Sequence, residues 1–143
     1  MSNSIVGNNG NPTDCLAWHE VEIGDDCQIG SNVSIVGPVT IGNNVIIMEN
    51  TVIGENCIIE KAIIAEDVKV GDNVTMGIGA DITNQVKPNI YSFGLVTIGE
   101  RSVIPSKVQI GKNTAISGLT VNADYVNGVL ESGETLIKAG DQA

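Results

Sequence analysis

Residues 23–64 read IGDDCQIGSNVSIVGPVTIGNNVIIMENTVIGENCIIEKAII, and an isoleucine recurs there at every sixth position. The series comprises Ile23, Ile29, Ile35, Ile41, Ile47, Ile53 and Ile59. Four residues after each lies a second small or branched side chain: Cys27, Val33, Val39, Val45, Thr51, Cys57 and Ile63. A period of six fits neither an amphipathic helix nor an alternating strand. It is typical of a parallel β-helix, in which a short strand and a tight turn alternate.

Each hexad of such a fold supplies one face of a triangular coil, so residues eighteen apart should stack. The expected ladders are Ile23–Ile41–Ile59, Ile29–Ile47–Ile64 and Ile35–Ile53–Val70. Branched isoleucine suits the inward, pleated position. The residue four later must be small because three faces converge on a narrow interior. Glycine and asparagine between them are expected to supply the left-handed backbone angles of the corners.

Composition limits the class of protein. The 143 residues are enough for one domain with a continuous core. The net charge of −10 argues against nucleic acid and anionic membranes as partners. No apolar run of spanning length and no signal peptide are present, so a cytoplasmic location is expected. The cysteines Cys15, Cys27 and Cys57 fall on the small inward position and lack paired metal-ligand spacing, so they are predicted to be buried and no metal site is expected.

The repeat predicts three segments. Residues 1–22 are interpreted as an imperfect first coil or N-terminal cap, with Ile5 eighteen residues before Ile23. Residues 23–118 are the β-helix, which loses one residue near 60–63 and is interrupted by an irregular loop at 81–97. The twenty-two residues from Met76 to Ile98 equal one coil plus four, which fits a bulged coil or a protruding loop. Residues 119–143 are interpreted as a C-terminal capping tail.

Outward apolar side chains accompany the inward series. Ile46, Val52 and Ile58 follow one another on successive strands. They are interpreted as a flat wall that packs against another subunit, or as residues that serve β-propensity alone.

Three segments resemble one enzyme family. Residues 50–67 (NTVIGENCIIEKAIIAED), 96–113 (VTIGERSVIPSKVQIGKN) and 127–133 (NGVLESG) resemble the C-terminal β-helix of ADP-glucose pyrophosphorylases, also called glucose-1-phosphate adenylyltransferases. The resemblance implies an all-β fold, a single-stranded left-handed parallel β-helix. It also implies a non-catalytic oligomerisation and regulatory domain of an enzyme of glycogen biosynthesis that makes ADP-glucose and diphosphate from ATP and glucose 1-phosphate.

The resemblance further suggests partners. Sister subunits or further copies of the chain, and a phosphorylated small-molecule effector, are the expected partners; no cofactor is expected. In the family, basic residues after the last coils help to bind effectors, whereas this tail has only Lys138. Arg101 and Lys112 remain as anion-binding candidates, because guanidinium and ammonium groups pair with phosphate. The alternative is that both are solvated charges. The family's nucleotide-binding domain has no counterpart in this sequence, so no catalysis is expected from it alone.

Two other functions stay open. Many hexapeptide-repeat proteins are acyltransferases with a CoA donor, and His19 would then act as the general base. As the only histidine, it cannot form a three-histidine zinc site. A pure structural scaffold is the other alternative.

Overall fold

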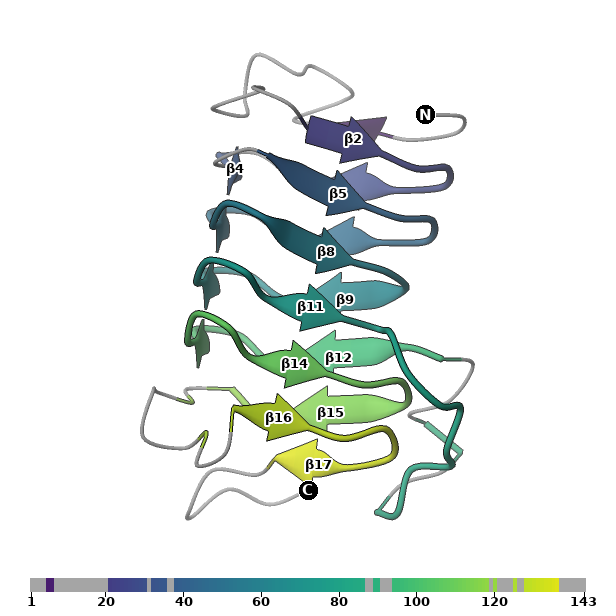
Figure 1. Ribbon diagram of the computed structural model, residues 1–143. Coiled ribbons are helices and arrows are strands. Elements are labelled where there is room, and N and C mark those ends of the chain that lie inside the picture. Colours follow the sequence, from purple (N-terminus) through teal and green to yellow (C-terminus); the bar gives the residue numbers. More distant parts are fainter. Residues whose placement is uncertain are drawn as a thin grey trace.

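The protein is a stack of coils made of short parallel strands joined by tight corners (Figure 1). The computed structural model describes residues 5–6, 21–30, 32–35, 38–86, 89–90, 94–118, 120, 125 and 128–136. Within these residues every regular element is a strand of two or three residues. The strands form three parallel sheets, which we name the front, rear and side sheets.

The chain visits the three sheets in turn. The front sheet contains β2 (Val21–Ile23), β5 (Val39–Ile41), β8 (Cys57–Ile59), β11 (Thr75–Met76), β14 (Gln109–Ile110) and β16 (Val129–Leu130). The rear sheet contains β1 (Ile5–Val6), β3 (Gln28–Ile29), β6 (Ile46–Ile47), β9 (Ala62–Ile64), β12 (Val96–Ile98), β15 (Thr114–Ile116) and β17 (Thr135–Leu136). The side sheet contains β4 (Ser34–Ile35), β7 (Val52–Ile53), β10 (Lys69–Val70) and β13 (Val103–Ile104).

The coil is left-handed. In Figure 1 the chain descends from the N-terminal end while it runs rightward along the front sheet and returns leftward through the fainter rear strands. Seen from the N-terminal end, this path turns counterclockwise as it recedes. The fold is therefore a left-handed parallel β-helix, opposite in hand to most parallel crossovers.

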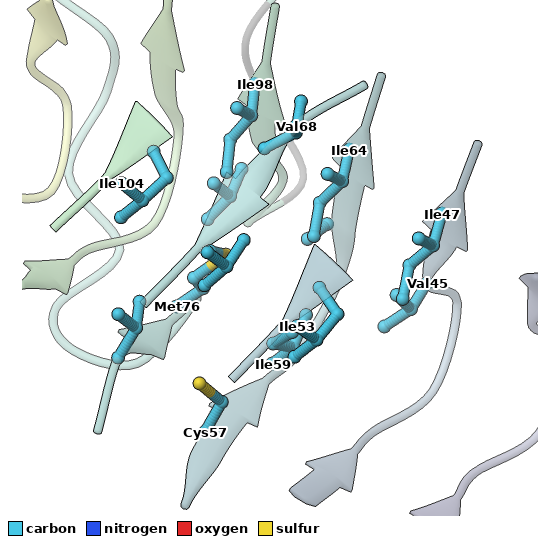
Figure 2. Close-up of a cluster of buried hydrophobic side chains, with 14 of the residues drawn as sticks. Val45, Ile47, Ile53, Cys57, Ile59, Ile64, Val68, Met76, Ile98 and Ile104 are labelled. Atoms are coloured by element: carbon cyan, nitrogen blue, oxygen red, sulfur yellow. The ribbon is translucent and has the colours of Figure 1, made fainter. Parts of the chain in front are cut away.

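The three predicted ladders are confirmed, and they form the core (Figure 2). Ile41 pairs with Ile23 and Ile59, Ile47 with Ile29 and Ile64, and Ile53 with Ile35 and Val70. The register slip is also confirmed, because Ile46 pairs with Ile63, seventeen residues later. Cys27 and Cys57 are buried as predicted; Cys15 lies outside the described residues.

The repeating glycines have a different role from the one predicted. Left-handed backbone angles at the corners belong mainly to non-glycine residues, most of them asparagine or aspartate: Asp26, Asn32, Asn44, Asn50, Asn56, Lys61, Asp67, Asn73, Arg101, Lys107 and Asn113. Gly133, at the corner after β16, is a glycine with such an angle (φ 84°). Gly24, Gly30, Gly42 and Gly54 are not among the positive-φ residues. Instead, the corner backbones of successive coils approach each other closely. A Cβ at Gly54 would lie 2.6 Å from the carbonyl oxygen of Gly71 in the next coil.

The segment between β11 and β12 is a protruding loop rather than a coil plus four residues. β12 pairs directly with β9, so Ile98 lies beside Ile64 and no coil intervenes. In Figure 1 the loop leaves β11 and descends beside the later coils. In an uninterrupted coil the next inward residue would follow Met76 after six residues. Ile98 follows after twenty-two, so sixteen residues are inserted at the corner between the front and rear sheets.

The ends of the chain also depart from the simple count. Val6 pairs with Ile29, so Ile5 lies over the rear sheet beside Gln28 and not over Ile23. The reason is that twenty-three residues separate Val6 from Ile29, five more than one coil. In the segment predicted as a tail, β16 pairs with β14 and β17 pairs with β15, so the stack continues to Leu136.

Candidate functional site

The outer side of the front sheet carries two surface hollows. Its outward side chains from β5 to β16 are Thr40, Ile58, Thr75, Gln109 and Val129, all uncharged. They alternate with buried neighbours, so each strand turns one side chain to the core and one to the surface. Ile58 is 40% exposed and Val129 48% exposed, which is high for large apolar side chains.

The front-face hollow near the C-terminal coils is a groove, which we name the strap groove, of about 420 Å³. Its lining comprises Thr75, Ile78, Gly79, Ala80, Ile82, Gln109, Ile110, Gly111, Val129, Leu130, Glu131 and Ser132. One wall is the protruding loop and the floor is the front sheet. Glu131 is the only charged residue of this lining, so the groove suits apolar or neutral groups better than phosphates.

A second hollow lies near the N-terminal coils. It is lined by Glu22, Pro38, Val39, Thr40, Asn56, Cys57 and Ile58. The two hollows share the same sheet and meet at neighbouring strands, because Ile58 lines the second hollow and its strand neighbour Thr75 lines the strap groove.

The predicted wall of Ile46, Val52 and Ile58 does not exist as one surface. Ile46 lies in the rear sheet, Val52 in the side sheet and Ile58 in the front sheet. The reason is geometric, because consecutive hexads occupy consecutive faces. A common wall is formed by residues one coil apart, such as Thr40, Ile58 and Thr75.

Arg101 and Lys112 lie at different corners of the β-helix. Arg101 lies between β12 and β13, at the corner of the rear and side sheets, and is exposed. Lys112 lies between β14 and β15, at the corner of the front and rear sheets, and is half-buried. The structure therefore does not bring the two cations together, and neither lines the strap groove.

The corner of Arg101 is acidic. The amide of Arg101 donates a hydrogen bond to the carbonyl oxygen of Glu66. The hydrogen bond between the Glu66 and Glu100 carboxyl groups is the largest cause that raises the pKa of Glu66, ahead of desolvation. The negative charges of Glu100, Asp67 and Glu49 raise it further. These carboxylates oppose anion binding by Arg101.

Two buried asparagines are the polar centre that sequence reasoning missed. Asn84, from the protruding loop, is 2% exposed, and Asn113, from the corner after β14, is 3% exposed. The side-chain amide of Asn84 donates a hydrogen bond of 2.8 Å to the carbonyl oxygen of Asn113. Asn113 sits at a positive-φ corner like Asn44 or Asn73, so no local signal in the sequence sets it apart.

Other candidate chemistry is limited in the described residues. His19, the alternative general base, lies outside them. Among the residues that the structure describes, no group of three or more His, Cys, Asp or Glu side chains is placed to hold a metal ion. The same part of the chain contains no helix able to span a membrane.

Comparisons with known proteins agree with the fold. The bacterial transferase hexapeptide family (six repeats) matches residues 20–54. Curated relatives named glucose-1-phosphate adenylyltransferase match at 57% identity over 65 residues in Lachnospira eligens, at 44% over 69 residues in Acetivibrio thermocellus and at 44% over 64 residues in Thermotoga maritima.

These matches cover a small part of each relative. The Lachnospira eligens match spans 46% of this chain and 15% of the relative, and the Acetivibrio thermocellus match spans 48% and 16%. Among solved structures, a mutant of AntD, an N-acyltransferase from Bacillus cereus bound to dTDP and coenzyme A, aligns with 91% of this chain and 68% of its own at 18% identity and a TM-score of 0.33. A likeness of that extent carries no statement about activity.

Proposed function

We propose that this chain is an assembly and regulatory β-helix of an ADP-glucose pyrophosphorylase-like nucleotidyltransferase, without catalytic activity alone. The similarity to glucose-1-phosphate adenylyltransferases, at 57% identity over 65 residues, supports the link to that enzyme. The parent reaction, which forms ADP-glucose and diphosphate from ATP and glucose 1-phosphate, belongs in this proposal to the rest of such an enzyme. The same proposal places the protein in the cytoplasm and gives it further copies or sister subunits as partners.

The observation that carries the assembly role is the uncharged outer side of the front sheet from β5 to β16, beyond the exposed Glu22 of β2. The whole chain has a net charge of −10, so two copies repel each other over most of their surfaces. From Thr40 to Val129 the outward residues of the front sheet are neutral, and two of them are exposed branched aliphatics. This face can meet an identical face without bringing like charges together, while it buries apolar surface.

The assembly role is tested by the mass of the chain in solution. We expect light scattering and sedimentation to show a dimer or higher oligomer whose fraction rises with concentration. Ile58→Glu introduces a charge at the centre of the front face and should shift the equilibrium to monomer. Val52→Glu is the matched control, because Val52 is 37% exposed but lies on the side sheet. A strict monomer at high concentration, or equal effects of the two variants, would contradict the assembly role.

The regulatory role is tested separately by ligand-dependent stability. Fructose 1,6-bisphosphate, phosphate and AMP at millimolar concentration should raise the melting temperature if an effector binds, by a stabilisation of about 1.4 kcal/mol at ten times the Kd. Arg101 and Lys112 lie at different corners, so an effector bound at one corner should lose its effect in Arg101→Ala or in Lys112→Ala, and not in both. Lys107→Ala, at the corner between the side and front sheets, should leave the increase unchanged. The absence of any increase would remove the effector site and leave the assembly role intact.

A further inference from the structure

The protruding loop is held to the coils mainly by polar contacts. We name residues 77–86, which are all described, the strap. Within it only Gly77 and Asn84 are buried. The large apolar side chains Ile78, Ile82 and Val86 are each 46–47% exposed. Hydrophobic burial therefore contributes less to the attachment of the strap than to the coils, whose isoleucines are fully buried.

Asn113 contacts the protruding loop at two places that are far apart in sequence. Its side-chain amide donates hydrogen bonds to Asp81 Oδ1 (2.5 Å) and to the carbonyl oxygen of Ile82 (3.0 Å). Its Oδ1 accepts a hydrogen bond from the amide of Gly94 (2.8 Å), where the chain returns to β12. One buried side chain thus joins the departing and returning ends of the loop.

Asn84 contacts the coils from the side of the strap. Its Nδ2 donates to the Asn113 carbonyl oxygen (2.8 Å) and to Thr135 Oγ1 (3.0 Å) of β17. Its Oδ1 accepts from the amide of Val86 (2.9 Å), which fixes the local turn of the strap. The adjacent amide of Gln85 donates to the carbonyl oxygen of Gly133 (2.9 Å). The strap is thereby joined to the corners after β14 and β16.

We infer that Asn84 and Asn113 form a polar latch that holds the strap against the corner of the front and rear sheets, and that the strap opens as a local unit while the coils stay folded. The latch decides whether the strap groove exists, because Ile78, Gly79, Ala80 and Ile82 form its outer wall. Opening removes that wall and bares the outer side of β14 and β16. The latch is thus a conformational switch on a ligand-sized groove, whatever the assembly state of the protein.

The physical basis is a difference in local stability. Detaching the strap breaks a small set of hydrogen bonds, each of modest net contribution, and exposes only the covered halves of a few aliphatic side chains and the groove floor. Opening a coil breaks ladder hydrogen bonds and exposes stacked isoleucines on three sheets. Segments with few buried apolar contacts open with lower free energy than core strands do. The amide hydrogens of the strap should therefore exchange when the strap alone detaches, without unfolding of the coils.

Hydrogen–deuterium exchange of the full chain tests the latch. In the unaltered protein the amide of Gln85, which donates to the carbonyl oxygen of Gly133 outside the strap, should exchange faster than the coil amide of Gly71, which donates to the carbonyl oxygen of Ile104. Asn113→Gly should accelerate exchange of the Gln85 amide, whose own acceptor stays in place, about ten- to a hundredfold, as expected for the loss of the three side-chain hydrogen bonds of Asn113, and leave Gly71 unchanged.

Two further variants keep the test decisive. Asn73→Gly is the matched control for Asn113→Gly, because Asn73 has the same left-handed corner conformation (φ 59° against 56°) but is exposed. Asn84→Ala removes the other half of the latch and leaves every corner unchanged. The inference fails if the strap amides exchange together with Gly71 in the unaltered protein, or if Asn113→Gly and Asn84→Ala accelerate them no more than Asn73→Gly does.

A charge swap supplies a rescue. Asn113→Asp places a second carboxylate beside Asp81, so the strap amides should exchange faster. Adding Asp81→Asn to the same chain returns an amide to that contact, while the carboxylate introduced at position 113 still accepts a hydrogen bond from the amide of Gly94. Exchange should then slow again. If the double variant exchanges as fast as Asn113→Asp alone, the contact between residues 81 and 113 does not hold the strap.

Discussion

Adjacent isoleucines in β8 should differ sharply in their contribution to stability. Ile59 points inward, is 0% exposed and stacks between Ile41 and Met76. Ile58 points outward and is 40% exposed. Ile59→Ala leaves a void between stacked side chains that the paired strands above and below keep from collapsing. Replacement of a buried isoleucine by alanine costs about 2–5 kcal/mol, and we expect about 3–4 kcal/mol here. Ile58→Ala should cost about 0.5 kcal/mol.

Urea unfolding of the two variants, followed by circular dichroism, measures this difference. With a slope of about 2 kcal/mol per molar urea, Ile59→Ala should lower the midpoint by about 1.5–2 M and Ile58→Ala by less than about 0.5 M. In a thermal scan the same loss corresponds to about 10 °C for Ile59→Ala. The comparison requires that the dependence of the unfolding free energy on urea concentration is the same in both variants. A changed slope would indicate that the coils unfold one after another and not in a single transition. Equal losses for the two variants, or a larger loss for Ile58→Ala, would refute the inward and outward assignment.

Three further predictions follow from the corners and the buried thiol. Glu66→Gln should stabilise the protein at pH 7. The carboxyl of Glu100 raises the pKa of Glu66 in the folded state, so deprotonation of Glu66 opposes folding. Urea midpoints should show that this gain in stability vanishes as the pH falls below the ordinary glutamate pKa of 4.5. Gly99→Ala should lower the melting temperature, because its Cβ would lie 2.3 Å from the amide nitrogen of Gly118. Cys57 should resist alkylation by iodoacetamide in the folded protein, because burial raises the pKa of its thiol, and react once urea unfolds the chain.

Each of these has a control in the same chain. Glu55→Gln removes an exposed carboxylate at another corner and should not reproduce the gain of Glu66→Gln. Ala65→Gly, at the position one coil before Gly99, should change the melting temperature less than Gly99→Ala does. Thr40→Cys adds an outward thiol on the strand beside Cys57 and should be alkylated at once. A stabilisation by Glu66→Gln that persists unchanged at pH values well below 4.5, a neutral Gly99→Ala or prompt alkylation of Cys57 would each contradict its prediction.

The core could be predicted from the sequence because its signal is repeated and local. Ile41, Ile47 and Ile53 recur every six residues, and a three-sided coil places residues eighteen apart on top of one another. The one-residue deletion before Ile64 is also visible in the sequence, because the interval from Ile59 to Ile64 is five residues and not six. The surface could not be read in the same way. Ile46, Val52 and Ile58 are neighbours in sequence but lie on three sheets.

The loop shows where counting fails. Twenty-two residues from Met76 to Ile98 fit a coil plus four as well as a hexad plus sixteen, and only the pairing of β12 with β9 distinguishes them. The buried contact of Asn84 with Asn113 joins residues twenty-nine apart across this insertion, so no repeat predicts it. Arg101 and Lys112 stand out by charge alone, and charge does not reveal which corner a residue occupies. The roles of His19 and Cys15 stay predictions.

The interruption between β11 and β12 has a practical consequence for engineering. The rear-sheet strands β9 and β12 still pair in the register of an uninterrupted stack, although the long insertion lies between β11 and β12. A foreign peptide or a small folded module could therefore be spliced into the exposed stretch 78–83 without disturbing the ladder beneath. The β-helix of such a protein would hold the inserted module at a defined position along its axis.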